Sequence, residues 1–292
     1  MKILVFDIGG TSIKYGVCVN NELQDVKETP TNAKLGGRHI MDTLISLIKE
    51  QSDYDAIGIS TAGQVNSKEG YIIYANQNIP NYTGTKIREE LEALFHVPVT
   101  VENDVNAAAM GEAVYGAGKD YDQFLMLTYG TGVGGATVNN KEVYYGSSFS
   151  ASEFGAIITH SDVRLAGNDY FDGCYEKYAS TTGLVKMAME YNPELDNGRK
   201  IFANLDDPKV MDIIDKWVDE IMLGLATLTH IYNPACIILG GGIMVQPLIM
   251  EKIAEKKSRF IMPSFAHVNL VPAALGNSAG LLGANYLASK TL

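Results

Sequence analysis

One local pattern occurs twice in this sequence and constrains the fold more than any other feature. In the first copy, an apolar run at residues 3–6 leads into Asp-Ile-Gly-Gly-Thr at 7–11, then an alternating stretch and Asn20-Asn21. In the second copy, residues 124–127 lead into the glycine-rich stretch 128–138 and then Asn139-Asn140. Each copy predicts a strand, a glycine-rich turn, a strand, a tight Asn-Asn hairpin turn and a third strand. Two such units facing each other would present backbone N–H groups to one polyphosphate, which indicates nucleotide-dependent phosphoryl transfer.

The charge balance limits the partners of the chain. Its 292 residues carry 23 Lys and Arg against 34 Asp and Glu, a formal net charge of -11. A chain this acidic lacks the basic surface of a nucleic-acid-binding protein, so we expect no nucleic-acid partner. It must bind an anionic ligand through oriented N–H groups, a few cations and a metal ion.

The cysteines and the apolar runs indicate a cytoplasmic protein without a membrane partner. Cys18, Cys174 and Cys236 are scattered and odd in number, which disfavours a disulfide framework and favours a reducing compartment. The apolar run before Asp7 is too short for a signal peptide. No segment approaches the roughly 20 apolar residues of a membrane span.

Helical and extended patterns alternate along the sequence, which is typical of an α/β protein. Apolar residues recur at helical spacing in residues 38–51, and Asn233-Pro234 ends a long amphipathic helix at 210–232. Residues 116–119, Gly-Ala-Gly-Lys, are the best candidate for a domain boundary. The other expected elements are helices at 85–95, 105–115 and 278–289 and strands at 56–60, 99–101 and 236–239, whereas 166–178 and 192–207 are the least regular stretches.

Asp7 follows the first strand and stands beside glycines that permit close backbone approach. A carboxylate in this place can hold Mg²⁺, directly or through water, against the phosphates of ATP. Thr11 and Lys14 are placed to assist on the same face. The alternative is a hairpin corner without a ligand, and the second copy of the pattern favours the phosphate-binding interpretation.

The second glycine-rich turn, residues 128–135, contains threonine hydroxyls that can donate to phosphate oxygens. It is not a Walker loop, because no Gly-Lys-Ser/Thr follows, and it lacks the strand–helix context of a dinucleotide fingerprint. Gly240-Gly241-Gly242 follows a strand and would let the backbone lie against an adenosine. Either stretch taken alone could be a sheet corner without a ligand.

Asn103 and Asp104 lie where a strand ends and a helix begins, and two interpretations fit them. Asn and Asp are preferred N-caps, each stabilising a helix by about 1 kcal/mol. Alternatively, Asp104 accepts the proton of a substrate hydroxyl while Asn103 orients that substrate. Both can hold, since α/β proteins bind ligands at the carboxyl ends of strands and a helix N-terminus favours an ionised carboxylate.

Glu153 and Glu176 flank a Gly- and Tyr-containing stretch, and carboxylates are suitable acceptors for vicinal sugar hydroxyls. Isolated glutamates are more often surface residues, so this interpretation depends on a wider pattern. His160 and Cys174 could suggest a metal, but two ligands do not make a closed tetrahedral zinc site.

Six short motifs together resemble the ROK family, the sugar kinases and related repressors of the actin-like ATPase superfamily. The motifs are residues 7–11, 102–104, 130–135, 153–155, 173–176 and 239–242. They occur in the family's order and cover essentially the whole chain. The resemblance implies two actin-like (ribonuclease H-like) α/β domains flanking a cleft. The small N-terminal domain would comprise residues 1–117 with the C-terminal helix at 277–292, and the larger domain residues 118–276.

The resemblance implies an ATP-dependent, Mg²⁺-requiring sugar kinase in which Asp104 is the general base for a hexose hydroxyl, usually the 6-hydroxyl. The sugar would bind between the domains, and Asp7 would hold Mg²⁺ through ATP. The implied sugar-binding residues are Gly63, Gln64, Asn76, Asn103, Glu153 and Glu176. The implied nucleotide-binding residues are Asp7, Gly9, Gly10, Thr11, Lys14, Thr131, Gly132, Gly240 and Gly241.

The chain departs from the family at the zinc site. Members usually carry Glu-x-Gly-His and then a Cys-x-Cys-Gly stretch that ends in Gly-Cys-x-Glu, which bind structural zinc. Here Ala156 occupies the histidine position and only Cys174 remains, so we expect no zinc and a loop at 166–172 held by packing. The family histidine also contacts the sugar near its anomeric hydroxyl. Alanine leaves space there for a substituent on carbon 1, which favours a β-glucoside such as cellobiose or gentiobiose.

Other functions remain open at this point. A glucokinase or an N-acetylmannosamine kinase would use the same site, and a non-catalytic sugar sensor would reuse the fold, although a sensor need not keep Asp104. An acetate-type kinase would want an arginine for its carboxylate substrate, and none lies in the pocket motifs. The repressor branch carries a DNA-binding extension before the first turn, and here the strand before that turn begins at residue 3. The sequence does not reveal the oligomeric state, but relatives are often dimers, so a homodimer fits the resemblance.

Overall fold

The computed structural model describes all 292 residues, and its internal contacts divide the chain into two units. Unit 1 comprises Met1–Asp122, Thr137–Ala151 and Asn277–Leu292, and unit 2 comprises Gln123–Ala136 and Ser152–Gly276. The domain limits expected from the sequence stay a prediction. No helix combines the length and the apolar character that crossing a membrane requires.

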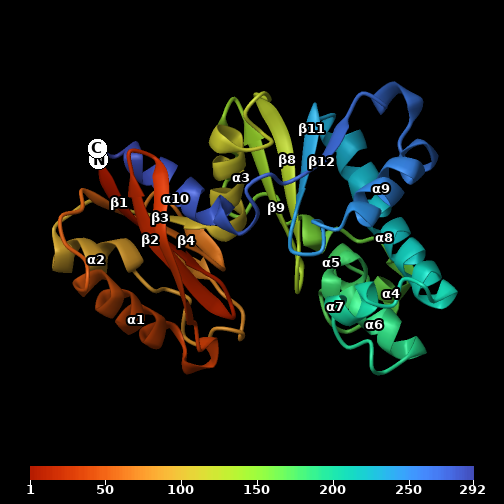
Figure 1. Ribbon diagram of the computed structural model, residues 1–292, viewed down its shortest axis with the longest axis horizontal. Helices are drawn as coiled ribbons and strands as arrows, with labels where there is room; N and C mark the ends of the chain where they lie inside the picture. Colours follow the sequence, from red (N-terminus) through yellow and green to blue (C-terminus); the bar gives the residue numbers. More distant parts are fainter. The chain divides into compact units, whose positions relative to one another are not determined.

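The centre of unit 1 is a five-stranded sheet with the strand order β3-β2-β1-β4-β7 (Figure 1). Its first three strands are antiparallel neighbours, and β4 and β7 are added in parallel to β1. Asn20 and Asn21 both have positive φ, as a tight hairpin turn between β2 and β3 requires. The predicted pattern of the first copy is therefore confirmed. The bounds are β1 (Lys2–Ile8), β2 (Ser12–Val19), β3 (Glu22–Pro30), β4 (Ala56–Thr61) and β7 (Val99–Asn103).

Helices cover both faces of this sheet because its strand residues are apolar on both sides. Leu4 and Phe6 pack in a core with residues of α1 and α2, whereas the alternate residues Ile3 and Val5 pack with α10. α10 also lies against α3 so closely that a Cβ on Gly283 would overlap the backbone of α3. The elements are α1 (Gly37–Lys49), α2 (Ile87–Phe95), α3 (Asp104–Tyr115) and α10 (Ala279–Ser289), with a small hairpin of β5 (Gln64–Asn66) and β6 (Tyr71–Tyr74).

The second sheet repeats the arrangement of the first, with the strand order β10-β9-β8-β11-β12. β11 and β12 run parallel to β8, as β4 and β7 do to β1. The expected Asn139-Asn140 turn is wrong by one residue: Asn139 pairs with Glu142, and the positive φ values fall on Asn140 and Lys141. The bounds are β8 (Gln123–Tyr129), β9 (Val133–Asn139), β10 (Glu142–Val143), β11 (Cys236–Gly240) and β12 (Asn269–Pro272).

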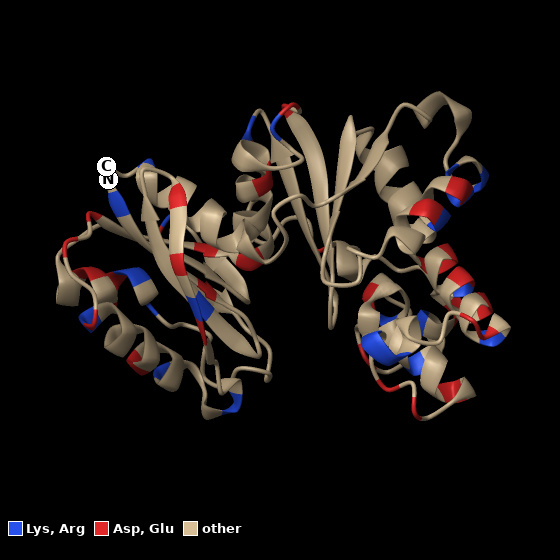
Figure 2. Cartoon of the chain, in the orientation of Figure 1, with Lys and Arg blue, Asp and Glu red and all other residues tan.

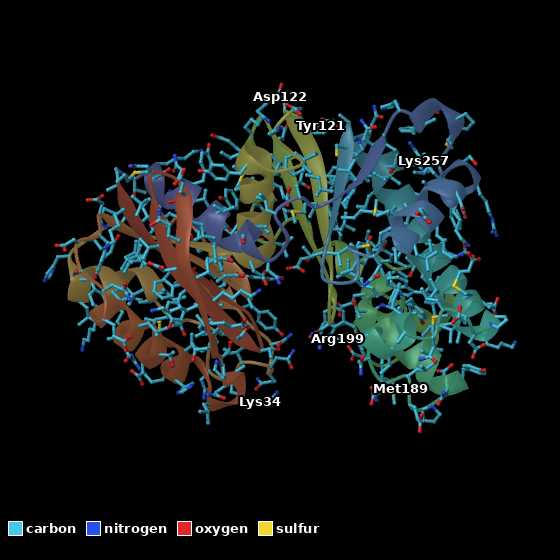
Figure 3. The ribbon with its side chains drawn as sticks, in the orientation of Figure 1. Lys34, Tyr121, Asp122, Met189, Arg199 and Lys257 are labelled. Carbon is cyan, nitrogen blue, oxygen red and sulfur yellow. The ribbon has the colours of Figure 1, made fainter.

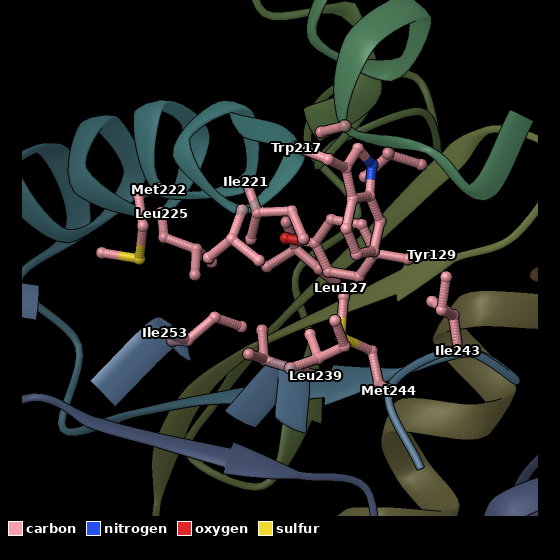
Figure 4. Packing of buried hydrophobic residues seen from close by; sticks show 14 of the residues in the cluster. Leu127, Tyr129, Trp217, Ile221, Met222, Leu225, Leu239, Ile243, Met244 and Ile253 are labelled. Carbon is pink, nitrogen blue, oxygen red and sulfur yellow. The ribbon is translucent and has the colours of Figure 1, made fainter. Parts of the chain in front are cut away.

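A long helix, α8, packs along the core of unit 2 and contributes more buried apolar residues to it than any other element. Its Trp217, Ile221 and Leu225 pack on Leu127 and Leu239 of the sheet (Figure 4). In this unit, charged residues of both signs are interspersed on the helices and loops (Figure 2). The helices are α4 (Ser161–Ala166), α5 (Tyr175–Ala179), α6 (Thr181–Tyr191), α7 (Gly198–Phe202), α8 (Pro208–Tyr232) and α9 (Pro247–Phe260). Short 3-10 turns span η1 (Ala33–Leu35), η2 (Phe154–Ala156), η3 (Pro263–Phe265) and η4 (Gly276–Ser278).

Candidate active site

Asp7 of unit 1 is held where β1 ends. It lies in register with Ser60 of β4, whose Oγ donates to Asp7 Oδ1 at 2.6 Å. A Cβ built on Gly280, in the first turn of α10, would lie 2.9 Å from the carboxylate carbon of Asp7. The positive end of the α10 dipole therefore stands beside this carboxylate. Burial raises the pKa of Asp7, while the Ser60 hydrogen bond and the charge of Lys14 act in the opposite direction.

The first glycine-rich turn is anchored from within unit 1 and open on its outer side. The Gly9 N–H donates to Ser12 O at 3.0 Å, and Thr31 Oγ1 donates to Gly9 O at 2.7 Å. Gly10 and Thr11 are exposed, and a Cβ on Gly10 would meet no atom within 4 Å. A turn fixed in this way can present its outer backbone to a ligand without rearranging.

Asn103, rather than Asp104, caps α3. Its Oδ1 accepts the N–H groups of Val105 and Asn106 at 3.0 and 3.1 Å. Its Nδ2 donates to Gly63 O and to Asp104 Oδ1, both at 3.0 Å. Asn103 is thus the N-cap residue, and Asp104 is an oriented carboxylate in the first helical turn whose Oδ1 also accepts the Val105 N–H at 2.9 Å.

The pKa of Asp104 is raised to about 7, first by burial and then by the negative charge of Asp7. A carboxylate with a pKa near neutrality is well matched to accept a hydroxyl proton. Proteins usually hold Mg²⁺ through one or two carboxylates together with the phosphates of a substrate, and Asp7 and Asp104 supply such oxygen donors. The residues present fit that ion.

A buried glutamate supports this end of β7. Glu102 accepts hydrogen bonds from Asn103 N at 2.8 Å, Asn106 Nδ2 at 3.1 Å and the Tyr145 hydroxyl at 2.8 Å. Burial raises the pKa of Glu102, and these donors oppose the rise. The sequence motif 102–104 contains this glutamate. No sequence pattern predicted its partner Tyr145, which lies 43 residues later in the chain.

Of the predicted sugar-binding residues, Gly63, Gln64 and Asn76 of unit 1 lie in the segment between β4 and α2. Gly63 has a φ of 101° and follows β4, and its carbonyl supports Asn103. Gln64 begins β5 and pairs with Tyr74 of β6. Asn76 lies beyond β6, and its Oδ1 accepts the Asn78 N–H at 3.0 Å within its own loop.

The second glycine-rich turn borders a cavity of about 760 Å³ that lies within unit 2. Gly130 N–H donates to Gly132 O at 3.0 Å, and the first N–H of α6, on Thr181, donates to Gly130 O at 2.9 Å. Gly130 and Thr131 are exposed toward solvent. The cavity has the volume of a small-molecule site. Its lining includes Gly130, Thr131, Thr181, Thr182, Asn197, Arg199 (labelled in Figure 3), Phe202, Gly242, Ile243 and Gln246.

The glycine triple after β11 has divided roles. Gly240 ends the strand opposite Thr128, and Gly241 has a φ of 104°. A Cβ on Gly241 would overlap the backbone of Tyr129, so glycine is needed for the chain to pass this point. The residue of the triple that lines the cavity is Gly242.

Glu153 and Glu176 come close to each other within unit 2. Glu176 lies in the first turn of α5 and accepts a hydrogen bond from the Val133 N–H. Burial raises the pKa of Glu176, and the charge of Glu153 adds to the rise. Hydroxyl groups that donate hydrogen bonds to two neighbouring carboxylates of this kind stabilise their negative charges.

Comparison with known proteins decides the family. A family model described as ROK family matches residues 3–291. This chain belongs to the ROK family. A β-glucoside kinase of Listeria monocytogenes is 33% identical over 98% of this chain and 97% of its own length. A ROK family glucokinase from Streptomyces griseus, solved with glucose and AMPPNP, has a TM-score of 0.85 and 30% identity, covering 99% of this chain and 100% of its own. A Listeria monocytogenes protein proposed to be an N-acetylmannosamine kinase has a TM-score of 0.89 and 32% identity, covering 98% of both chains.

The loop where the ROK pattern places zinc is held by hydrogen bonds as well as by packing. Cys174 Sγ lies 3.4 Å from both Ala156 O and Tyr170 O, and its single S–H can donate to either carbonyl. Asp172 Oδ2 accepts the N–H groups of Asn168 and Asp169 at 3.1 and 3.0 Å. No three His, Cys, Asp or Glu side chains gather as a metal site. The absence of zinc stays a prediction for this ROK protein.

Sequence reasoning missed the part of the cavity built by α6 and α7. These residues come from segments without a glycine-rich motif. The available signal was weak: Ser180 before Thr181 is an N-cap, and its Oγ accepts the Gly183 N–H at 3.1 Å. Such caps occur at many helices without a ligand, so the cap alone could not have identified the site.

Proposed function

We propose that this ROK family protein transfers the γ-phosphoryl group of ATP to the 6-hydroxyl of a hexose or β-glucoside, with Asp104 as the general base. The observation that carries this proposal is the placement of Asp104. Its Oδ1 is fixed by Asn103 and by the Val105 N–H at 2.9 Å, and its pKa is raised to about 7. Asp104 takes the hydroxyl proton as the sugar oxygen attacks the γ-phosphorus.

The cavity of unit 2 supports ATP as the phosphoryl donor. It joins the glycine-rich turn at Gly130 and Thr131 to apolar and polar side chains of α6 and α7. Backbone N–H groups of the turn suit the phosphates, and the roughly 760 Å³ beyond it suits a nucleoside. The ROK glucokinase at TM-score 0.85 was solved with an ATP analogue.

Asp7 is proposed to hold Mg²⁺ together with the phosphates of ATP. When bound, the ion supplies positive charge to the phosphoryl group that is being transferred. Ser60 keeps Asp7 in place by the 2.6 Å hydrogen bond, and Lys14 adds a positive charge on the neighbouring strand. Catalysis would then depend mainly on positioning and charge.

A β-glucoside is the favoured substrate because Ala156 is small and exposed next to Glu153. The 33% identical relative is a β-glucoside kinase. Glucose is the alternative that the glucokinase neighbour supports, and N-acetylmannosamine is the alternative that the Listeria neighbour supports. A non-catalytic sensor is disfavoured, because the carboxylates required for chemistry are held in place.

ADP release with glucose, N-acetylmannosamine, cellobiose and gentiobiose tests the proposal. We expect turnover with Mg²⁺ and at least one β-glucoside, and a lower ratio of cellobiose to glucose activity in Ala156→His. A rate with glucose alone, unchanged in that variant, would replace the β-glucoside assignment by glucokinase. Absence of turnover with every sugar would overturn the kinase assignment.

A further inference from the structure

Glu176 lies in unit 2 between the carboxylate of Glu153 and the second glycine-rich turn. Its carboxylate accepts the Val133 N–H, directly after the glycine-rich turn that borders the cavity. A Cβ built on Gly132 would lie 2.6 Å from Glu176 Oε2, and one built on Gly155 would lie 3.2 Å from the same atom. The carboxylate proposed to bind sugar hydroxyls is therefore packed directly onto the turn proposed to bind phosphate.

The backbone on both sides of this contact is firmly anchored. The hydroxyls of Tyr129 and Tyr175 lie 2.8 Å apart, and Tyr175 donates to Ile221 O of α8 at 2.8 Å. Tyr129 immediately precedes the turn, and Tyr175 immediately precedes Glu176. A change at the contact must therefore be taken up by the Glu176 carboxylate rather than by movement of α5 or β8.

The negative charge at this contact opposes nucleotide binding when no sugar is bound. An ionised carboxylate beside Gly132 repels the phosphates of a nucleotide, and the neighbouring Glu153 adds to the negative charge. Sugar hydroxyls that donate to Glu176 spread its charge and fix its orientation against the turn. Both effects lower the free energy of binding a nucleotide next.

We propose that Glu176 couples the two substrates, so that a bound sugar raises the affinity of the glycine-rich turn for nucleotide and a bound nucleotide raises the affinity for sugar. The inference rests on the proposed kinase function and adds to it an energetic link between the substrates. Reciprocity is required, since coupling free energy belongs to the pair of ligands. The link would also disfavour nucleotide binding, and hence hydrolysis, in the absence of a sugar.

Two glycine variants test the contact from the side of the turn. Gly132→Ala would displace the Glu176 carboxylate, whereas Gly130→Ala adds a Cβ that meets no atom within 4 Å. Neither glycine has a positive φ, so alanine is tolerated by the backbone. Titration calorimetry with glucose and cellobiose, without nucleotide, should show sugar affinity lowered about fivefold or more in Gly132→Ala and unchanged in Gly130→Ala. Equal sugar affinity in the two variants would overturn the inference.

A carboxamide variant tests the coupling itself and serves if Gly132→Ala fails to fold. In the parent protein, AMPPNP with Mg²⁺ should bind about fivefold or more tightly when the sugar is saturating. Glu176→Gln should bring this ratio to within about twofold, while Glu153→Gln should weaken sugar binding and keep a clearly larger ratio than Glu176→Gln, because Glu153 only adds to the charge at the contact. A parent that phosphorylates sugar without any such ratio, or a Glu176→Gln variant that keeps it, would refute the coupling and leave the kinase function standing. Failure of sugar phosphorylation in the parent would remove the proposed function, and the coupling with it.

Discussion

Replacing Asp104 by Asn should weaken catalysis and strengthen the fold, and the second effect depends on pH. Burial and the charge of Asp7 raise the pKa of Asp104 from 3.8 to about 7. The folded state therefore holds a proton on Asp104 that the unfolded state has already released at pH values between these two. By linkage, stability falls as pH rises through this window and stays reduced above pH 7.

The size of the effect follows from the same shift. A change from 3.8 to about 7 is roughly three powers of ten in proton affinity, each worth about 1.4 kcal/mol. Because Asp104 keeps some solvent exposure, an ionised carboxylate there should oppose folding by an amount on the order of 3 kcal/mol. Asparagine has nearly the same shape and no charge, so Asp104→Asn should escape this penalty.

Thermal unfolding of Asp104→Asn and the parent at pH 5.5 and pH 8 measures the difference. We expect the variant to melt higher by about 5 °C at pH 8 and by less at pH 5.5. Turnover should fall about 10²-fold or more, with sugar and ATP still bound. If Asp104 merely stabilised the N-terminus of α3, the variant would melt lower at pH 8, by the equivalent of about 0.3–1 kcal/mol. A lower melting temperature, or a near-normal rate, would refute the reasoning.

Three further changes have expected outcomes. Gly280→Ala should lower the affinity for Mg-ATP in kinetic assays, because its Cβ would press on the Asp7 carboxylate at 2.9 Å; an unchanged KM for ATP would contradict this. Tyr145→Phe removes the 2.8 Å donor to buried Glu102 and should cost about 1–3 kcal/mol in urea unfolding, whereas exposed Tyr144→Phe should cost almost nothing; equal costs would exclude this role. EDTA treatment should leave the melting temperature of the ligand-free protein unchanged, and a marked drop would indicate structural zinc.

The duplicated strands were predictable because their signals are local. Short apolar runs indicated β1 and β8, and Asn20-Asn21 supplied the positive φ that a tight turn needs. The second turn was predicted at Asn139-Asn140 because two consecutive asparagines favour a tight turn. In the structure Asn139 pairs with Glu142, so the turn lies at Asn140 and Lys141. Tertiary pairing outweighed the local preference by one residue.

Candidate site residues could be selected from the sequence only where they stand at strand ends. Asp7 and Asp104 each stand at the end of a strand, which made them candidates, and the structure ends β1 and β7 at the same edge of the parallel strands. Asn197 and Arg199 of the cavity come from α7, whose position depends on how helices pack on α8. No local pattern carries that information, so this part of the cavity could be found only from the structure.

The packing of α10 on β1 affects how the protein folds while it is being synthesised. A ribosome delivers Met1–Asp122 first and Asn277–Leu292 only after the whole of unit 2 has been synthesised. Until then Ile3 and Val5 lack the cover of α10, whose Leu281, Ala284 and Ala288 belong to the same buried cluster. The nascent first unit therefore exposes an apolar surface until α10 has been made. The risk of aggregation is greatest in this interval, before the chain leaves the ribosome.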